Sequence, residues 1–319
     1  MINSYNGWSS YSVFFSAENT QAYLKKCYTR HGIDQPEAKS YENCYPFIYY
    51  LEHGKIYYEQ AAKSPLLIQP IMLFYGLVHL IKASILTADP NYPETTSVLA
   101  HGVSTRKRKK QQYSFFEDEV KFQKTGLFPF MADKLFHMKH MEGDKIEMGE
   151  LFKYIPELNE LFQQTEGSPA FAGIELANGQ LTMPASILDQ FHMTEERFID
   201  YFNSKGSYDI ESPAQGESGK ITFSCGQVPP HDIRPLMFNI QEGSLSFPLT
   251  KGNLVNFPEL LLHYLLLYNL SMIARYETEW WSELMKMMPN KDYPFIHSFL
   301  EITLLKGPYL VYQYLIGQK

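Results

Sequence analysis

The sequence predicts an α+β fold that is mainly helical, with a helical body and a smaller α+β insert. Long apolar segments with helical spacing lie toward both ends of the chain, at residues 65–86 and 257–275. Hairpin signals concentrate between them, at Asn178–Gly179 and Glu242–Gly243. Since each apolar helix needs a partner to cover it, we expect the two ends of the chain to share one core.

The expected organisation has three parts. Residues 1–164 form a helical region that carries a basic loop and a hairpin, and residues 165–255 form the α+β insert. Residues 256–319 supply C-terminal helices that pack on the first region. No repeat with a fixed period interrupts this plan.

The N-terminal part starts with a helix from about Ser16, which can cap it, to Arg30. Residues 34–46 are expected to be a loop, followed by short aromatic segments broken at Gly54. The long apolar helix should then begin at Pro65.

Further along, strand-like pieces with a turn at Gly126 are followed by a helix broken before Pro156. Thr194 is expected to cap a helix, and residues 220–225 to form a strand. The chain closes with helical patterns at residues 257–275, 277–288, 294–305 and 307–316.

Composition limits the classes of function. The formal net charge of −7 argues against bulk nucleic-acid binding. Three cysteines without paired spacing indicate reduced thiols in a cytoplasmic protein and predict no metal site. The apolar segments contain polar residues, and the N-terminus lacks a signal peptide, so we expect core helices and no membrane association.

A polar ribbon runs along the first apolar helix. Tyr75, His79 and Lys82 follow the spacing i, i+4 and i+7, so they share one face of the helix. Their neighbours are apolar, and buried polar groups need partners. The ribbon therefore indicates either an internal hydrogen-bond network or the wall of a ligand cleft.

A second ribbon, with the spacing i, i+4, i+7 and i+11, consists of Tyr264, Tyr268, Ser271 and Arg275. Arg275 can pair with Glu277 or Glu279, or it can bind a carboxylate or phosphate through its planar guanidinium group. We expect the two ribbons to converge in a cleft that contains Tyr75, His79, Tyr268 and Arg275.

Five consecutive cations form a basic run in this acidic chain: Arg106, Lys107, Arg108, Lys109 and Lys110. A solvated loop, a phosphate site and a docking site for an acidic partner all remain open. We favour anion binding, with nearby donors from His101, Ser104 and Thr105.

Enzyme signatures are absent from the sequence. There is no GxSxG, HExxH, GxxxxGK[ST] or GxGxxG pattern, and no residue is assigned a catalytic role. The alternative is an enzyme acting on a phosphorylated or nucleic-acid substrate, with His79 or His101 as acid or base.

Three segments together resemble the YaaC-like proteins of Bacillus and related Firmicutes: FYGLVHLIKASIL, HGVSTRKRKKQQYSFFEDEVKFQKTGLFP and LLLHYLLLYNLSMIARYETEWW. The resemblance covers nearly the whole chain. Genes of this family often lie beside that of IMP dehydrogenase. The resemblance therefore suggests a role linked to purine metabolism. Together with the basic run, the polar ribbons and the lack of catalytic motifs, it leads us to expect a cytosolic regulatory or binding protein that binds a purine nucleotide or docks on IMP dehydrogenase. No cofactor is expected.

A more distant resemblance links FYGLVHLIKASIL and HGVS to the helix pair of HEPN-type bundles, which implies an HEPN-like helical body. Catalytic members carry an Arg followed a few residues later by a His. That motif is absent after Arg30, Arg106 and Arg275. The resemblance therefore does not imply ribonuclease activity.

Overall fold

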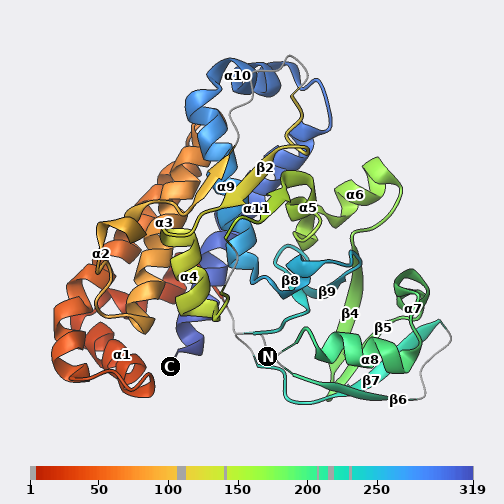
Figure 1. Cartoon of the computed structure of the whole chain (residues 1–319), viewed down its shortest axis with the longest axis horizontal. Helices are drawn as coiled ribbons and strands as arrows, with labels where there is room; N and C mark the ends of the chain where they lie inside the picture. Colours follow the sequence, from red (N-terminus) through yellow and green to blue (C-terminus); the bar gives the residue numbers. More distant parts are fainter. Residues whose placement is uncertain are drawn as a thin grey trace. The chain divides into compact units, whose positions relative to one another are not determined.

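The structure, a computed structural model, describes residues 5–105, 113–139, 142–206, 208–214, 219–229 and 232–318. Helices hold 58% of the residues and the described strands form two small antiparallel sheets, which confirms the predicted fold class (Figure 1). The chain divides into two compact units. One is Glu150–Glu259, and the other, the helical unit, joins the segments before and after it. The limits predicted for the insert stay a prediction.

The helical unit begins with the 3-10 helix η1 (Gly7–Phe15), followed by α1 (Ala17–Arg30), α2 (Pro36–Ala61) and α3 (Gln69–Ala88). Ser16 caps α1 as predicted, because its side chain accepts the N–H of Asn19 at 3.4 Å. Pro70 lies in the first turn of α3, where a proline removes no helical hydrogen bond.

The predicted loop at 34–46 and the break at Gly54 are wrong, since α2 is one continuous helix. Pro46 lies on its exposed side, where the carbonyl that loses its helical partner is not buried in the core. Gly54 lies against α3, and a Cβ there would be 2.5 Å from Cδ2 of Leu80. Tertiary packing therefore uses Gly54, a residue that locally disfavours the helix.

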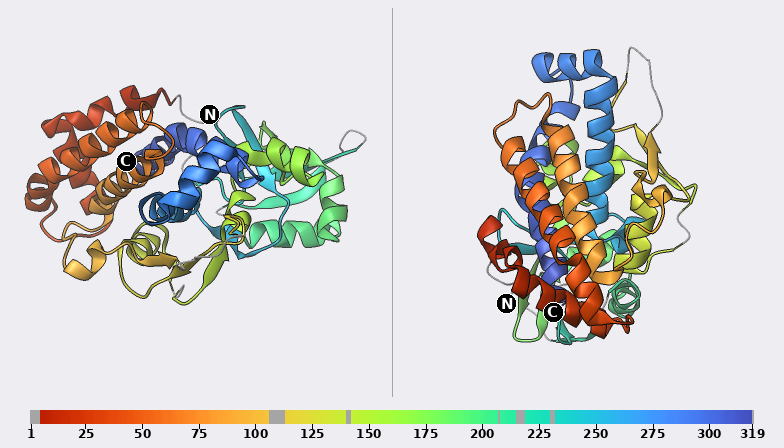
Figure 2. Two further views of the ribbon diagram at one scale, coloured as in Figure 1. Left: turned by 90° about the horizontal axis from the view of Figure 1, so that it is seen from above. Right: turned by 90° about the vertical axis from the view of Figure 1, so that its left-hand side faces the viewer.

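The C-terminal helices of this unit are α9 (Glu259–Tyr276), α10 (Thr278–Met287) and α11 (Asp292–Gly317). The two helices predicted at 294–305 and 307–316 are one helix, α11, which continues through Gly307 and Pro308. Gly307 and Pro308 both disfavour a helix locally. The packing of α11 on α3, visible in Figures 1 and 2, stabilises the helix across these two residues.

Tyr58 of α2 lies between two glycines on different helices. A Cβ on Gly76 of α3 would be 2.8 Å from its ring, and one on Gly307 of α11 would overlap its hydroxyl oxygen. The tyrosine is only 2% exposed, and its hydroxyl has no hydrogen-bond partner in the described part of the chain. The two glycines thus let α2, α3 and α11 meet around one aromatic ring.

Helix α3 is long and apolar enough to cross a membrane by length and composition. Its apolar window is, however, 67% buried by the protein itself, as in the core helix of a soluble protein. This agrees with the sequence-based expectation of a core helix.

The smaller sheet pairs β1 (Val103–Thr105), β2 (Glu119–Phe122) and β3 (Lys145–Glu147) in that order. The short helix η2 (Thr96–Leu99) precedes it, and α4 (Leu127–Phe136) follows β2. The turn predicted at Gly126 is therefore the start of a helix and not the turn of a hairpin. The basic run Arg106–Lys110 lies outside the described residues.

Helix α5 (Met148–Phe152) spans the boundary at which the other unit begins. It is followed by η3 (Pro156–Leu158) and α6 (Asn159–Glu166), which confirms the break before Pro156. Its sheet has the order β6-β7-β5-β4-β9-β8 and is antiparallel throughout. The strands are β4 (Phe171–Ala177), β5 (Gln180–Pro184), β6 (Ile210–Ala214), β7 (Lys220–Cys225), β8 (Met237–Asn239) and β9 (Ser244–Pro248).

Both predicted hairpins occur in this sheet, with turns at Asn178–Gly179 and near Gly243. Helices α7 (Ser186–Phe191) and α8 (Glu195–Asn203) pack on it, and η4 (Asn253–Asn256) ends the unit. Thr194 caps α8 as predicted, accepting the N–H of Arg197 at 3.4 Å.

We predict that Gly307→Ala lowers the free energy of unfolding by about 1–3 kcal/mol, because the added methyl overlaps Tyr58. Tyr58→Phe should be close to neutral alone, since it removes a buried hydroxyl without a partner. In the double variant it should restore part of the loss. Urea unfolding followed by circular dichroism measures all three variants.

The matched control is Gly173→Ala, where a Cβ meets nothing within 4 Å and the effect should stay within about 0.5 kcal/mol. An equal loss in Gly307→Ala with and without Tyr58→Phe would contradict the packing argument.

Candidate functional site

The two polar ribbons meet at the contact between α3 and α9. Nη1 of Arg275 donates a hydrogen bond to the hydroxyl of Tyr75 at 3.0 Å. Next to it, the ring of Phe74 lies 5.3 Å from that of Tyr264 and 5.7 Å from that of Tyr268. The predicted contact between the two helices is therefore confirmed.

His101 is fixed at this contact by a close crossing of two backbone segments. Gly102 and Gly126 have positive φ angles of +77° and +126°, and a Cβ on Gly126 would overlap the backbone of Gly102. The carbonyl of His101 accepts the N–H of Phe128 at 3.1 Å and the hydroxyl of Tyr264 at 2.8 Å. The backbone of His101 is thus held from two sides.

The side chain of His101 lies among the aromatic residues of the two ribbons. Its ring is 5.1 Å from Phe74, 5.5 Å from Tyr268 and 6.3 Å from Tyr75. The structure thus brings His101 and Arg275 together at Tyr75, whose ring lies beside His101 and whose hydroxyl accepts from Arg275.

Helix α2 adds three residues that sequence reasoning missed: Tyr50, His53 and Tyr57. The ring of Tyr57 stacks on His79 at 5.6 Å, and His53 lies 5.2 Å from His79. Nζ of Lys82 lies 5.8 Å from the centre of the Tyr50 ring. Their spacing, i, i+3 and i+7, places them on one helix face, but the predicted break at Gly54 concealed this pattern.

We call this group the cationic cluster. It comprises Tyr50, His53, Tyr57, Tyr75, His79, Lys82, His101, Tyr268 and Arg275.

Burial keeps two histidines of the cluster, His79 and His101, neutral. The pKa of His79 is lowered to about 4, mainly by burial and further by the charge of Lys82 and by His53. Burial is also the main reason for the lowered pKa of His101, with added effects of Arg275 and Lys82. The cationic side chains of the cluster are Lys82 and Arg275, and burial lowers the pKa of the Lys82 ammonium group.

These two cations lack a carboxylate partner. Nε of Arg275 donates to the carbonyl of Ser271 at 3.0 Å, and neither Glu277 nor Glu279 forms the ion pair that the sequence left open. In the part of the chain that the structure describes, neither Arg275 nor Lys82 takes part in an ion pair. Both side chains are half-buried, so the charge is also poorly solvated.

His79 has an unused polar atom in the same place. Its Nδ1 is buried and has no hydrogen-bond partner among the described residues. Such a group destabilises a fold by about 1–3 kcal/mol unless a partner satisfies it. A ligand with a hydrogen-bond donor or acceptor at this position would supply that partner.

Other predicted site residues lie elsewhere or serve the fold. The hydroxyl of Ser104 on β1 accepts Nε2 of Gln123 at 2.7 Å, and no contact joins Thr105 on the same strand to the cluster among those described. Tyr264 and Ser271 are buried and donate to backbone carbonyls. Half of the α9 ribbon is thus an internal network. The basic run cannot be placed, since it lies outside the described residues.

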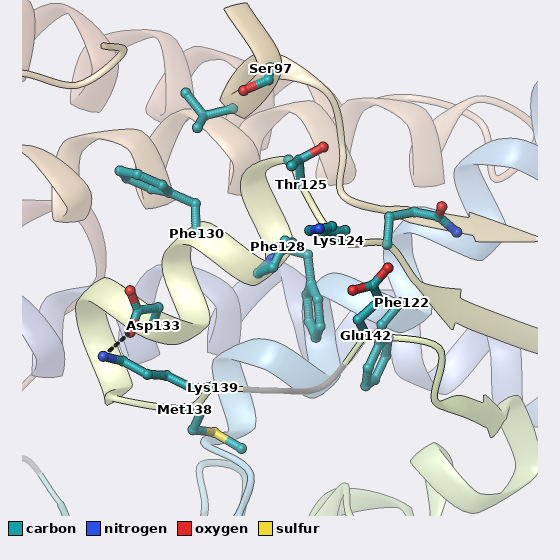
Figure 3. A pocket seen from close by; sticks show the side chains of 14 residues that line it. Ser97, Phe122, Lys124, Thr125, Phe128, Phe130, Asp133, Met138, Lys139 and Glu142 are labelled. Carbon is teal, nitrogen blue, oxygen red and sulfur yellow. Dashed lines mark ion pairs between the residues drawn. The ribbon is translucent and has the colours of Figure 1, made fainter. Parts of the chain in front are cut away.

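A pocket of about 390 Å³ opens around the start of α4 (Figure 3). Gly126 and Phe128, from the crossing that holds His101, line it together with Phe122 and Phe130. Lys124 contributes a charge at this pocket. The pocket and the cationic cluster are thus separate features that share one backbone crossing.

The first turn of α4 does not offer backbone donors to an anion in this pocket. The N–H of Leu127 bonds to the carbonyl of Ala100 at 2.7 Å, the N–H of Phe128 bonds to His101, and Pro129 has none. An anion there would depend on side chains alone, whereas the cationic cluster holds two unpaired charges. We therefore take the cluster as the candidate site.

Within the described residues, no group of three or more His, Cys, Asp or Glu side chains is placed to hold a metal ion. All three cysteines are free thiols. Burial raises the pKa of Cys27 to about 11, so this thiol is protonated and unreactive.

The fold and the cluster define a mainly helical protein with a half-buried, cationic and aromatic surface. Residues 12–315 match the family described as YaaC-like protein, and the chain belongs to this family. The resemblance seen in the three sequence segments is thereby confirmed, whereas the HEPN-type likeness is not shown and stays a prediction. Comparisons with curated proteins and with solved structures gave no match.

We predict that His79 makes stability depend on pH. Its pKa is about 4 in the folded protein against 6.5 for a free side chain, so the unfolded state binds more protons between these values. The free energy of unfolding should therefore fall as pH decreases from about 6.5 to about 4. His79→Gln should reduce this slope, as measured by urea unfolding at several pH values.

Lys82→Met is the companion variant for a histidine titration by NMR. It should raise the pKa of His79 but leave it below 6.5, because burial is the larger cause. A His79 ring that titrates near 6.5 in the wild-type protein would contradict the electrostatic description of the cluster.

Proposed function

We propose that this protein is a cytoplasmic regulatory protein that binds a purine nucleotide at the cationic cluster. The observation that carries the proposal is the pair of half-buried cations, Lys82 and Arg275, without a carboxylate partner in the described part of the chain. Removing positive charge from water is unfavourable unless an anion accompanies it. A phosphate group would supply that anion.

The geometry supports an elongated ligand. The guanidinium group of Arg275 donates a hydrogen bond to Tyr75 of α3. Lys82 lies seven residues after Tyr75 on the same helix, which corresponds to about 10 Å along its axis. Between them lie the neutral ring of His79 and the stacked ring of Tyr57. A phosphate at one cation and a planar base among these rings would use both features.

The choice of a purine rests on the family. The resemblance to YaaC-like proteins implies a link to IMP dehydrogenase and to guanine nucleotide synthesis. A protein that binds a purine nucleotide without a recognisable catalytic set fits a sensor of that pathway. Docking on IMP dehydrogenase would then carry the signal, with the basic run Arg106–Lys110 as the proposed contact.

We predict that purine mononucleotides such as IMP and GMP bind with measurable heat in isothermal titration calorimetry, whereas inosine, which lacks the phosphate, does not. Arg275→Gln should weaken binding by about tenfold to a hundredfold, because it removes charged hydrogen bonds to the ligand. The melting temperature of each variant shows whether it remains folded.

Two controls locate the site. Arg197→Gln changes an exposed arginine on α8 and should bind as the wild type does. Lys124→Gln changes the pocket at α4 and should also leave affinity unchanged. Absence of saturable binding by any purine nucleotide, or wild-type affinity in Arg275→Gln, would overturn the proposal. Weaker nucleotide binding in Lys124→Gln alone would indicate that the site is the pocket at α4.

We predict a separate effect for the basic run. Replacing residues 106–110 by Ser and Gln should change stability by no more than about 0.5 kcal/mol, as for ordinary surface substitutions. Binding to nucleotide or to IMP dehydrogenase should weaken and lose most of its salt dependence, since exposed charges are screened within about 8 Å at physiological salt. A salt titration that matches the wild type would show that the run is a solvated loop.

A second candidate function is an enzyme that acts on a phosphorylated substrate. The observation that favours it is the neutral ring of His101, which can accept a proton while Arg275 stabilises charge beside it. Chromatography of the titration mixtures distinguishes the two functions, because only an enzyme converts the nucleotide to a product. Turnover that His101→Gln abolishes, with binding retained, would favour the enzyme.

A further inference from the structure

Helix α2 has a second, exposed side that the cationic cluster does not use. Tyr41, Tyr45 and Tyr49 follow the spacing i, i+4 and i+8, and are 72%, 55% and 55% exposed. Ile56 continues the stripe and is 49% exposed. Four large side chains in one row on one helix are unusual for a surface that faces only water.

The opposite side of α2 supplies the apolar side chains that this helix contributes to the core. Cys44, Phe47, Leu51 and Tyr58 are buried there. Helices α1 and α3 pack against α2 (Figure 1). The exposed tyrosines therefore add nothing to the core. Tyrosine is enriched in protein interfaces, because it combines a large apolar ring with a polar hydroxyl.

Acidic side chains interrupt the same stripe. Glu42 and Glu52 are exposed and form no ion pair in the described part of the chain. Glu59 is 3.8 Å from Lys55, the cation that borders this side. We call Tyr41, Glu42, Tyr45, Tyr49, Glu52 and Ile56 the acidic tyrosine face.

The charge restricts what can cover this face. Two copies of the chain that met through it would place the carboxylates of both copies in one interface, and like charges across an interface disfavour association. An anionic membrane surface is disfavoured for the same reason. A cationic partner would instead neutralise both carboxylates.

We propose that the acidic tyrosine face docks an arginine-rich segment of another protein. Arginine fits both of its elements, since the guanidinium group stacks on tyrosine rings and pairs with carboxylates through two hydrogen bonds. The stripe from Tyr41 to Ile56 covers sixteen residues of helix, and its two ends are about 22 Å apart. A helical segment of about 15 residues matches that length. This inference is independent of the proposed nucleotide site.

The test uses a fluorescein-labelled helical peptide of about 15 residues with arginine along one face and alanine elsewhere. Fluorescence anisotropy should show saturable binding to the full chain. The paired variant Tyr45→Ser with Tyr49→Ser should weaken it roughly tenfold, as expected for the loss of two cation–π contacts. Glu42→Gln with Glu52→Gln should weaken it as well and reduce its salt dependence.

Matched variants control for non-specific attraction. Met287→Ser removes a more exposed apolar side chain (75%) from α10, and Glu279→Gln with Glu283→Gln removes two exposed charges there. Both should bind the peptide like the wild type. A lysine version of the peptide should bind more weakly, because lysine lacks the planar fork.

Three outcomes would overturn the proposal: equal peptide binding by the tyrosine pair variant and the wild type, a dimer in analytical ultracentrifugation that this variant abolishes, and binding to phosphatidylglycerol vesicles that it abolishes. The second outcome would assign the face to another copy of the chain, and the third to a membrane. All substitutions lie on exposed positions, so circular dichroism should report an unchanged fold.

Discussion

The helical unit depends on the place of one side chain, Tyr58. Its ring fills the space that Gly76 and Gly307 leave open, so α2, α3 and α11 approach more closely than helices with ordinary side chains would allow. This packing fixes α2 against α3. Tyr57, the neighbour of Tyr58, can for that reason stack on His79, and the two helices form one surface of the cationic cluster.

The cluster itself is an electrostatic exception within an acidic protein. Its chain has a net charge of −7, yet Lys82 and Arg275 are half-buried without an ion pair in the described part. Buried charges in proteins usually have a partner of opposite charge. Two half-buried cations without such a partner therefore indicate a functional role more than a stabilising one. Helix α2 contributes residues to this site and also carries the acidic tyrosine face, where the proposed partner docks.

Part of the cluster follows from local spacing. Tyr75, His79 and Lys82 had to share a face once their segment was helical, and the same holds for Tyr268 and Arg275. The contribution of α2 did not follow. Proline and glycine, here Pro46 and Gly54, normally disfavour a helix, so the sequence did not predict that this segment is helical. Without a predicted helix, the spacing of Tyr50, His53 and Tyr57 did not place them on one face. The family resemblance identified the protein class but gave no position for these side chains.

The sequence by itself determined the mainly helical α+β class, the caps at Ser16 and Thr194, and both hairpins, because these depend on residues close together in the chain. Only the tertiary structure decided that α2 and α11 continue through unfavourable residues, and that Arg275 bonds to Tyr75 and not to a neighbouring glutamate. The reason is physical. Contacts between distant segments contribute more free energy than the local preferences they override, and they have no signature within a short stretch of sequence.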